Sequence, residues 1–318
     1  MLQPWAAIFF SRVDDERSKR LKKQGVISLG EAFVDFISQD QTNTNYQRLL
    51  GGATVNVAVG VQRLGIPSYY LCKLGMDETS VFVQEEMKKE QVNLSYCTYE
   101  ATKKICSVYV HVNDQGDRYF HSYINETPDD WMTAEELDKE LFIQSKTFYF
   151  GSGTLFHPVA RKTTNQALEF AREGNLLVAF DTNIRLKRWE SEEQCREVIL
   201  SYVNMADIVK MAEDELLFLT KSDTFEQGLE SISNMNIPFL FITRGKYGAF
   251  ASHKGILVNI PGIQVKAVDT TGAGDAFMAA LLSRFHDNGV PEDQALLEEY
   301  TSFANLAGAK STTQFGSL

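Results

Sequence analysis

The four residues Gly272-Ala273-Gly274-Asp275 combine a glycine turn with a carboxylate. The two glycines let the turn adopt unusual dihedral angles and let an anion approach its backbone closely. Apolar residues at helical spacing follow from 276 to 285, so we expect the turn to open a helix whose first N–H groups and dipole attract negative charge. Such an anion cradle beside Asp275 suits phosphoryl transfer, because the turn's amides steady the developing charge while the carboxylate takes the acceptor's proton. The alternative is that Asp275 only caps the helix.

The elements around this turn must position it. Residues 263–267 alternate and are apolar enough to predict a strand that leads into the turn. Upstream, expected strands alternate with expected helices, which predicts a parallel sheet covered by helices on both faces. The strands are expected near 26–30, 68–73, 146–150, 176–180 and 206–210, and the helices near 54–64, 78–91, 158–172, 191–202 and 294–309.

Ligands in such folds bind where the parallel strands end at their carboxyl side. That rule selects the segments 151–153, 181–185, 210–215 and 243–246. A different pattern interrupts the alternation: residues 105–111 and 118–123 alternate on either side of the turn 113–116. We therefore expect a small antiparallel flap beside the main sheet.

The composition is that of an ordinary globular enzyme, with 44% hydrophobic and 23% charged residues in 318. The net charge of −11 argues against nucleic-acid and anionic-membrane partners. Cys72, Cys97, Cys106 and Cys195 show no Cys-x-x-Cys pairing, so we expect reduced thiols and a cytoplasmic protein. Residues 1–24 differ from the rest and are expected to be an N-terminal extension to which we assign no role.

Two motifs, about 200 residues apart, together resemble the signatures of the ribokinase-like, or PfkB, carbohydrate kinases. One is the segment 269–275, Asp-Thr-Thr-Gly-Ala-Gly-Asp; the other is the segment 51–58, Gly-Gly-Ala-Thr-Val-Asn-Val-Ala, followed by Arg63-Leu64-Gly65 and Gly75-Met76-Asp77. The resemblance covers about 26–316 and implies one kinase domain over 25–318. It also implies a three-layer α/β sandwich with a mainly parallel central sheet and a small β lid, built from about 33–48 and 105–124.

The resemblance further implies the substrates and partners. They are ATP with Mg²⁺, a sugar acceptor, the monovalent cation K⁺, and a second copy of the chain bound through the lid. Because the chain ends soon after Gly316, any monovalent-cation site built from the tail is in doubt. A lid would exclude water, which is the wrong nucleophile in a kinase.

The resemblance also assigns roles to individual residues. Asp275 is the base and Gly272, Ala273 and Gly274 are the anion cradle. The implied sugar-binding residues are Asp35, Gly51, Gly52, Asn56, Tyr123 and Arg185. The implied ATP-binding residues are Asn183, Lys210, Thr243, Arg244, Gly245, Gly248 and Asn305. Several of these could instead be structural: Asp35 a solvated strand end, Tyr123 part of the lid core, Arg244 a solvated turn charge, and Asn305 part of a helix contact.

Glu215 fits the family's Asn-x-x-Glu element, which helps to hold magnesium through water. Ala212 stands where that element has its Asn, which weakens the metal assignment. Acids at 213 and 214 could equally be ordinary residues of a helix's first turn.

The segment 30–36, Gly-Glu-Ala-Phe-Val-Asp-Phe, looks most like fructokinases. Relatives that act on 2-keto-3-deoxygluconate tend to carry an Arg after the lid tyrosine. Here Tyr123 is followed by Ile124 and Asn125, which favours a neutral sugar. We expect phosphorylation of D-fructose to fructose 6-phosphate, with 2-keto-3-deoxygluconate kinase and ribokinase as alternatives of the same family.

The sequence gives weaker support to functions of other classes. The chain has no Gly-x-x-x-x-Gly-Lys-Ser/Thr, which excludes a P-loop kinase, and the glycines of 272–274 have the wrong spacing and place for a nicotinamide dehydrogenase. A non-catalytic sugar-binding relative would not need Asp275.

Overall fold

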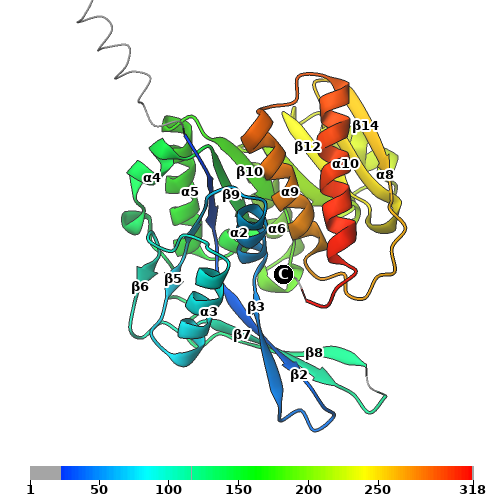
Figure 1. The fold of residues 1–318 in the computed structure, drawn as a ribbon. Helices are drawn as coiled ribbons and strands as arrows, with labels where there is room; N and C mark the ends of the chain where they lie inside the picture. Colours follow the sequence, from blue (N-terminus) through cyan, green and yellow to red (C-terminus); the bar gives the residue numbers. More distant parts are fainter. Residues whose placement is uncertain (1–22, 116, 317–318) are drawn as a thin grey trace, which may run out of the picture.

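The computed structural model describes residues 23–115 and 117–316. The expected extension at 1–24 lies almost wholly outside this range. The main body is an eight-stranded sheet sandwiched between two layers of helices, and a smaller sheet projects from one side of it (Figure 1).

The strand order of the main sheet is β14-β13-β12-β11-β10-β9-β1-β4. From β12 to β4 the pairs are parallel, whereas β13 and β14 form an antiparallel edge. The bounds are β1 (Val26–Leu29), β4 (Ser68–Leu71), β9 (Thr147–Gly151), β10 (Leu177–Asp181), β11 (Ile208–Ala212), β12 (Phe239–Thr243), β13 (Gly248–His253) and β14 (Ile256–Pro261).

Helices cover both faces of this sheet. On one face lie α2 (Ala53–Arg63), α9 (Ala273–Asn288) and α10 (Gln294–Ser311). On the other lie α4 (Lys139–Gln144), α5 (Pro158–Glu173), α6 (Glu192–Val203), α7 (Glu213–Thr220) and α8 (Phe225–Ser233).

The alternation along each strand explains this layering. In β9, Phe148 and Phe150 pack among the side chains of α4–α7, while Tyr149 between them packs against the α9 and α10 layer. In β10, Phe180 and Ala179 divide in the same way. A strand buried on both faces reads as a continuous apolar run, which is why these strands are predictable from the sequence.

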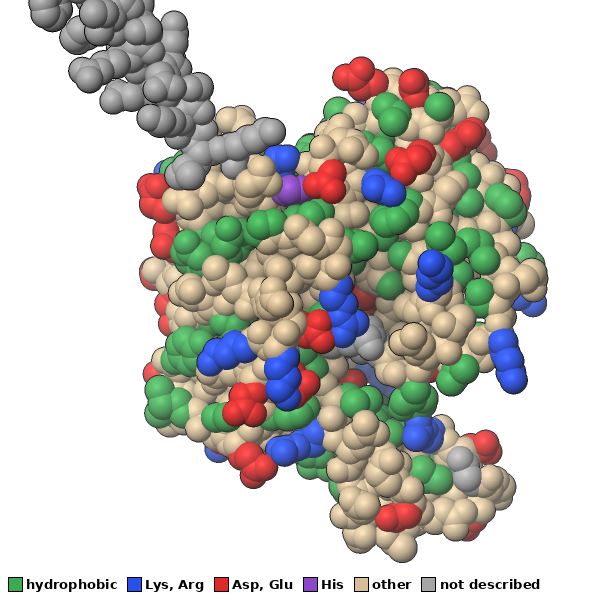
Figure 2. Space-filling view, viewed as in Figure 1, with side chains coloured by type: hydrophobic (Ala, Val, Ile, Leu, Met, Phe, Trp, Pro, Cys, Tyr) green, Lys and Arg blue, Asp and Glu red, His purple; other side chains and the backbone are tan. Residues whose placement is uncertain are grey.

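The projecting sheet contains the expected antiparallel flap as the pair β7–β8, but β7 also pairs in parallel with β2, so the whole sheet is mixed, with strand order β3-β2-β7-β8. Its strands are β2 (Phe33–Ser38), β3 (Tyr46–Gly51), β7 (Cys106–Val112) and β8 (Arg118–Ile124). We call these four strands the lid. The surface is hollowed where the lid leaves the body (Figure 2). The helix α3 (Glu78–Lys89) and the short pair β5 (Lys73–Leu74) and β6 (Thr98–Tyr99) lie at the base of the lid.

One expected element is wrong. Residues 262–267 have no regular structure, although 263–267 was expected to be a strand. The hairpin β13–β14 ends at Pro261 and leaves no neighbour with which the segment could pair, and Ile263 and Val265 remain 39% and 38% exposed. Their apolar side chains instead line a cavity, as described below. Among the described residues, no helix is long and apolar enough to cross a membrane.

Candidate active site

Asp275 lies in the first turn of α9, which begins at Ala273, three residues before the periodic pattern suggests. Gly272 is the residue just before the helix and has φ 77°, a conformation that side chains disfavour, so the turn requires glycine. In the described structure the amides of Gly272 and Gly274 have no hydrogen-bond acceptor, whereas the amide of Ala273 donates to Thr270 O at 3.3 Å. The start of α9 therefore offers N–H donors to an anion beside a carboxylate.

A hydrogen bond fixes the Asp275 carboxylate. Asn56 Nδ2, in the first turns of α2, donates to Asp275 Oδ2 at 2.7 Å. Burial raises the pKa of Asp275 above its usual value, and the Asn56 hydrogen bond and the charges of Lys210 and Arg185 oppose this rise. The side chain is half-buried, so it can meet a substrate. The carboxylate therefore does more than cap its own helix, since it accepts a hydrogen bond from another helix.

Lys210 lies behind the glycine turn at 272–274, which we call the anion turn. Its Nζ is 3.2 Å from both carboxylate oxygens of Asp181, and it would lie only 2.8 Å from a side-chain carbon placed on Gly274. Burial alone would lower the pKa of Lys210, but Asp181, Glu215 and Asp275 raise it above its usual value. Lys210 is therefore an ammonium held against the backbone of the turn. Lys210 is not among the described residues that line the neighbouring cavity, which is described below. Its charge therefore acts on that space across the backbone of the turn.

The second motif positions Asp35. A side-chain carbon at Gly51 would lie 2.6 Å from Asp35 Oδ2, so any other residue there would displace this carboxylate. Gly52 follows with φ 110° and precedes α2, the helix that carries Asn56. Burial raises the pKa of Asp35 to about 6, because no cation lies close enough to compensate it in the described structure.

The pairing of the lid strands places further residues on the same face of the sheet as Asp35. Asp35 pairs with Val108 of β7, and Val108 pairs with Tyr123 of β8, so the three lie in one row. Tyr123 Oη donates to Cys106 Sγ at 3.1 Å, and its ring meets Phe33 edge-on at 5.9 Å. This face, the anion turn and Asn56 together form a candidate acceptor site.

A cavity of about 680 Å³ opens beside the anion turn, on the side away from the lid residues. Its size suits a nucleotide. It is lined by Ala212, Glu213, Asp214, Leu217, Thr243, Arg244, Gly245, Lys246, Gly248, Ile263, Gln264, Val265, Ala267, Thr270, Ala273, Gly274, Phe277, Asn305, Gly308, Ala309 and Thr312. The residues expected to bind ATP from the loop after β12 and from α10 all lie in this wall.

Two of the wall residues that were expected to bind ATP form contacts with the protein itself. Arg244 forms a two-pronged contact with Glu213, with both N···O distances 3.2 Å, and lies 4.0 Å above the Phe225 ring. Asn305 Nδ2 donates to Pro261 O at 3.0 Å. Both side chains therefore shape the cavity wall as well as facing it.

The loop after β10 carries the remaining expected residues. Asn183 has φ 29°, and its carbonyl accepts a hydrogen bond from Ser152 Oγ at 2.9 Å. Arg185 is exposed, and its charge acts on Asp275. Arg185 therefore belongs to the surroundings of Asp275, whereas the contacts of Asn183 are with Ser152 and Asp181.

Glu215 holds this loop to the start of α7. Its carboxylate accepts hydrogen bonds from Thr182 Oγ1 and from the amides of Ile184 and Ala212. Because both carboxylate oxygens already accept hydrogen bonds, Glu215 is poorly placed to bind a metal directly. Among the described residues, no three His, Cys, Asp or Glu side chains form a metal-binding group.

Sequence reasoning missed several site residues. The apolar wall at 263–267 was taken for a strand, because alternation cannot show whether a partner strand exists. The segment 181–185 was selected, but Asp181, the last residue of β10, was given no role of its own. The pairing of Lys210 with Asp181 was not foreseeable from spacing, since it depends on the register between β10 and β11.

Comparisons with known proteins identify the family of the chain. The family model "pfkB family carbohydrate kinase" matches residues 23–318. "Probable fructokinase-5" of Arabidopsis thaliana is 33% identical over 300 residues, which cover 92% of this chain and 93% of that protein. A crystal structure of fructokinase from Vibrio cholerae O395 in a fructose-, ADP- and calcium-bound form is 30% identical, with a TM-score of 0.81, and covers 93% of this chain and 94% of that one.

A second solved structure extends the range of acceptors among the relatives. It is aminoimidazole riboside kinase from Salmonella enterica, complexed with aminoimidazole riboside and an ATP analogue. It is 29% identical, with a TM-score of 0.82, and covers 92% of this chain and 94% of that one. Both solved relatives share the layered α/β fold described above. The match over nearly the whole chain shows that the protein belongs to the pfkB family of carbohydrate kinases.

Proposed function

We propose that this kinase transfers the γ-phosphoryl group of ATP to the primary hydroxyl of a neutral sugar, D-fructose, and forms fructose 6-phosphate. The observation that carries the proposal is the hydrogen bond from Asn56 to Asp275 at the start of α9, between the nucleotide-sized cavity and the lid face. The segment 30–36 and the relatives that are fructokinases support fructose as the acceptor.

The chemistry follows from these positions. The acceptor hydroxyl oxygen bonds to the γ-phosphorus while the bond to the bridging β–γ oxygen breaks and ADP leaves. Asp275 takes the hydroxyl proton, and the N–H groups of the anion turn, backed by Lys210, steady the phosphoryl oxygens. Since a loose transition state releases this proton late, full ionisation of Asp275 matters more than its basicity. Asp35 accepts hydrogen bonds from the sugar hydroxyls.

Mg²⁺ fits this site as a companion of the nucleotide. It would neutralise charge on the phosphates, held by them and, through water, by Glu215, while the exposed carboxylate of Asp214 lies in the cavity wall. A role for K⁺ and a cytoplasmic location belong to the proposal as well. All four cysteines are free and buried, as a reduced protein would have them.

We also propose that a second copy of the chain binds through the lid. The outer strand β8 exposes Tyr119 by 45%, Phe120 by 60% and Ile124 by 44%. Large apolar side chains on an edge strand favour pairing with another chain. Light scattering of the protein and of the variant Phe120→Glu tests this, and a monomer in both would contradict it.

The experiment that tests the function measures ADP release by purified protein with ATP and magnesium. The acceptors are D-fructose, D-ribose, 2-keto-3-deoxygluconate and adenosine, each with the Asp275→Ala variant beside it. Turnover on fructose that falls by about 10²–10⁴ in the variant, with sugar binding little changed, supports both the base and the substrate. Turnover on another acceptor keeps the mechanism and replaces fructose. Equal turnover in the variant overturns the base, and silence on all four favours a non-catalytic sugar-binding protein.

A further inference from the structure

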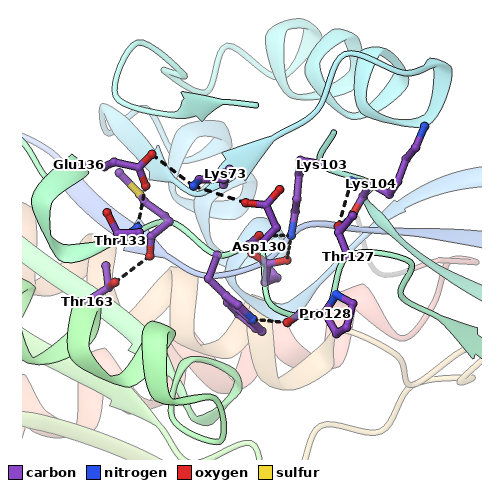
Figure 3. A network of polar contacts seen from close by, with 12 residues as sticks. Lys73, Lys103, Lys104, Thr127, Pro128, Asp130, Thr133, Glu136 and Thr163 are labelled. Carbon is purple, nitrogen blue, oxygen red and sulfur yellow. Dashed lines mark hydrogen bonds and ion pairs between the residues drawn. The ribbon is translucent and has the colours of Figure 1, made fainter. Parts of the chain in front are cut away.

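Lys103 is a cation buried at the base of the lid. Only 1% of its side chain is exposed, and its Nζ lies 3.1 Å from Glu31 Oε2 and donates to Asp130 O at 2.6 Å (Figure 3). The side chain of Glu31 is only 7% exposed. Burial raises the pKa of Glu31, and the charges of Lys103 and Arg188 oppose that rise. The two buried charges therefore compensate each other.

The three residues that Lys103 joins lie where the chain passes between the body and the lid. Glu31 lies between β1 and β2, Lys103 lies just before β7, and Asp130 lies in the segment that follows β8. The remaining connection, from β3 to α2, touches the same place, because a side-chain carbon on Gly52 would lie 2.9 Å from the carbonyl oxygen of Glu31. All four lid strands are thus connected to the body around one ammonium group.

A second lysine ties this group of residues to the body. Lys73 of β5 pairs with Asp130 at 3.4 Å and with Glu136 at 3.3 Å (Figure 3). The three carboxylates of the group are matched by two lysines and by Arg188, whose charge acts on Glu31 and whose guanidinium lies among three aromatic rings. The charges in this part of the described structure therefore balance without a ligand.

The ion pair lies directly before the two strands whose pairing places the acceptor residues. β2 and β7 run parallel, and their pairing begins with Phe33 opposite Cys106. Glu31 precedes the first of these residues by two positions, and Lys103 precedes the second by three. Asp35 lies two positions further along β2. Because a slip of one residue turns every side chain of a strand to the other face, a contact that fixes the start of this pairing also fixes the face on which Asp35 lies.

We propose that Lys103 is a positioning residue, which through its ion pair with Glu31 holds the lid strands to the body so that Asp35 and Asp275 meet the same acceptor. A buried ion pair contributes little net stability compared with an apolar pair of similar volume, because the cost of desolvation offsets the attraction. Its directional contacts, however, fix the point at which three chain segments meet, which apolar side chains cannot do. This inference rests on the proposed function, because it concerns the same acceptor site.

The test replaces both charges, in Lys103→Met/Glu31→Met, so that no buried charge is left unpaired. We expect this variant to melt within a few degrees of the unmodified protein. Its KM for D-fructose should rise by about tenfold or more, the loss of about one charge-assisted hydrogen bond to the sugar, while its KM for ATP changes by less than about twofold. ADP release without acceptor should increase relative to transfer, because a misplaced lid admits water.

Two further variants complete the test. Glu31→Gln keeps the shape of the side chain and weakens the ion pair, so it should show the same split between the two KM values on a smaller scale. Lys104→Met is the matched control, because it removes the neighbouring lysine, whose ion pair with Asp77 at 3.3 Å is partly exposed. This control should change neither KM nor the release of ADP without acceptor.

Amide hydrogen exchange gives a second reading that needs no turnover. We expect the amides of β2, β7 and β8 to exchange faster in the double variant, whereas those of β9, β10 and β11 keep their rates. Unchanged exchange in the lid, an unchanged KM for fructose, or KM values that rise alike for both substrates would each overturn the role of Lys103. If the unmodified protein turns over no acceptor while exchange in the lid differs as expected, the proposed function fails and the anchoring of the lid by Lys103 stands.

Discussion

Asn56 Nδ2 and Asp275 Oδ2 lie 2.7 Å apart, although 219 residues separate them in the chain. The contact joins the first turns of two helices on the same face of the sheet, one following the glycine pair at 51–52 and the other following the glycine turn at 272–274. Each of the two sequence motifs thus supplies one partner of the pair. The helix that carries Asn56 is also the one whose preceding strand passes Asp35.

Replacing Asn56 tests this pairing. Without the amide, the pKa of Asp275 should rise further, because burial then acts with less opposition. We expect Asn56→Ala to lower kcat/KM by about 10–100-fold and to move the acid limb of its pH profile to higher pH. An unchanged acid limb would show that the contact does not set the ionisation of Asp275. Asn165→Ala is a suitable control, because it removes an Asn–Tyr202 hydrogen bond of 2.6 Å far from the site.

Asp35 makes the stability of the protein depend on pH. Its pKa in the folded protein, about 6, lies above its usual value of 3.8, so between these values the folded state binds more protons than the unfolded state. Stability therefore falls as pH rises from 3.8 to 6, and the full cost of about 1–3 kcal/mol is present above pH 6. We expect Asp35→Asn to melt several degrees higher than the unmodified protein at pH 8, with the gain disappearing toward pH 4.

The same variant should bind sugar poorly, because an amide replaces a carboxylate acceptor. Its KM for the acceptor should rise at least tenfold at pH 8, which is the loss of about one charge-assisted hydrogen bond. A variant that is no more stable at pH 8 than the unmodified protein would contradict the raised pKa. One that keeps its KM would contradict the sugar contact.

The layered fold and the anion turn were predictable because each depends on local pattern. Strands such as β9, which are buried on both faces, are continuous apolar runs in the sequence. A glycine at 272 likewise indicates a positive-φ backbone conformation that other residues disfavour. The segment 263–267 was not predictable, since pairing depends on a neighbouring strand and not on the alternation of Ile263 and Val265. The ring contacts of Arg188 were unpredictable for a related reason, because Phe33, Tyr123 and Phe156 come from three distant segments of the chain.

Lys210 and Asp181 form a buried ion pair whose two roles can be separated. Lys210→Met leaves Asp181 uncompensated and should destabilise the protein by about 3–5 kcal/mol. The double variant Lys210→Met/Asp181→Asn removes both charges and should recover most of that loss. If the Lys210 ammonium helps the anion turn to stabilise the phosphoryl oxygens, kcat of the double variant should remain at least tenfold below that of the unmodified enzyme. One electrostatic donor contributes about this much or more to the rate. Full recovery of kcat together with the melting temperature would leave Lys210 a structural role only.

The lid is tied to the catalytic loop through the C-terminal segment. Arg118 of β8 lies 4.1 Å above the Phe315 ring, and the next amide, that of Gly316, donates to Asp269 Oδ2 at 3.2 Å. Asp269 also accepts from the amide of Thr271, one residue before the anion turn. A contact that closes the lid should therefore also order the turn.

Arg118→Ala should loosen this closure. We expect KM for the acceptor to rise about two- to fivefold, the value of one exposed cation–π contact, and ATP hydrolysis without acceptor to increase because water enters more easily. The measurements are steady-state kinetics and phosphate release in the absence of sugar. Lys139→Ala removes a cation that lies 5.5 Å from the Phe170 ring on the far layer, and should change neither quantity. An Arg118→Ala enzyme with unchanged KM and unchanged hydrolysis would mean that the contact between the lid and the tail does not govern closure.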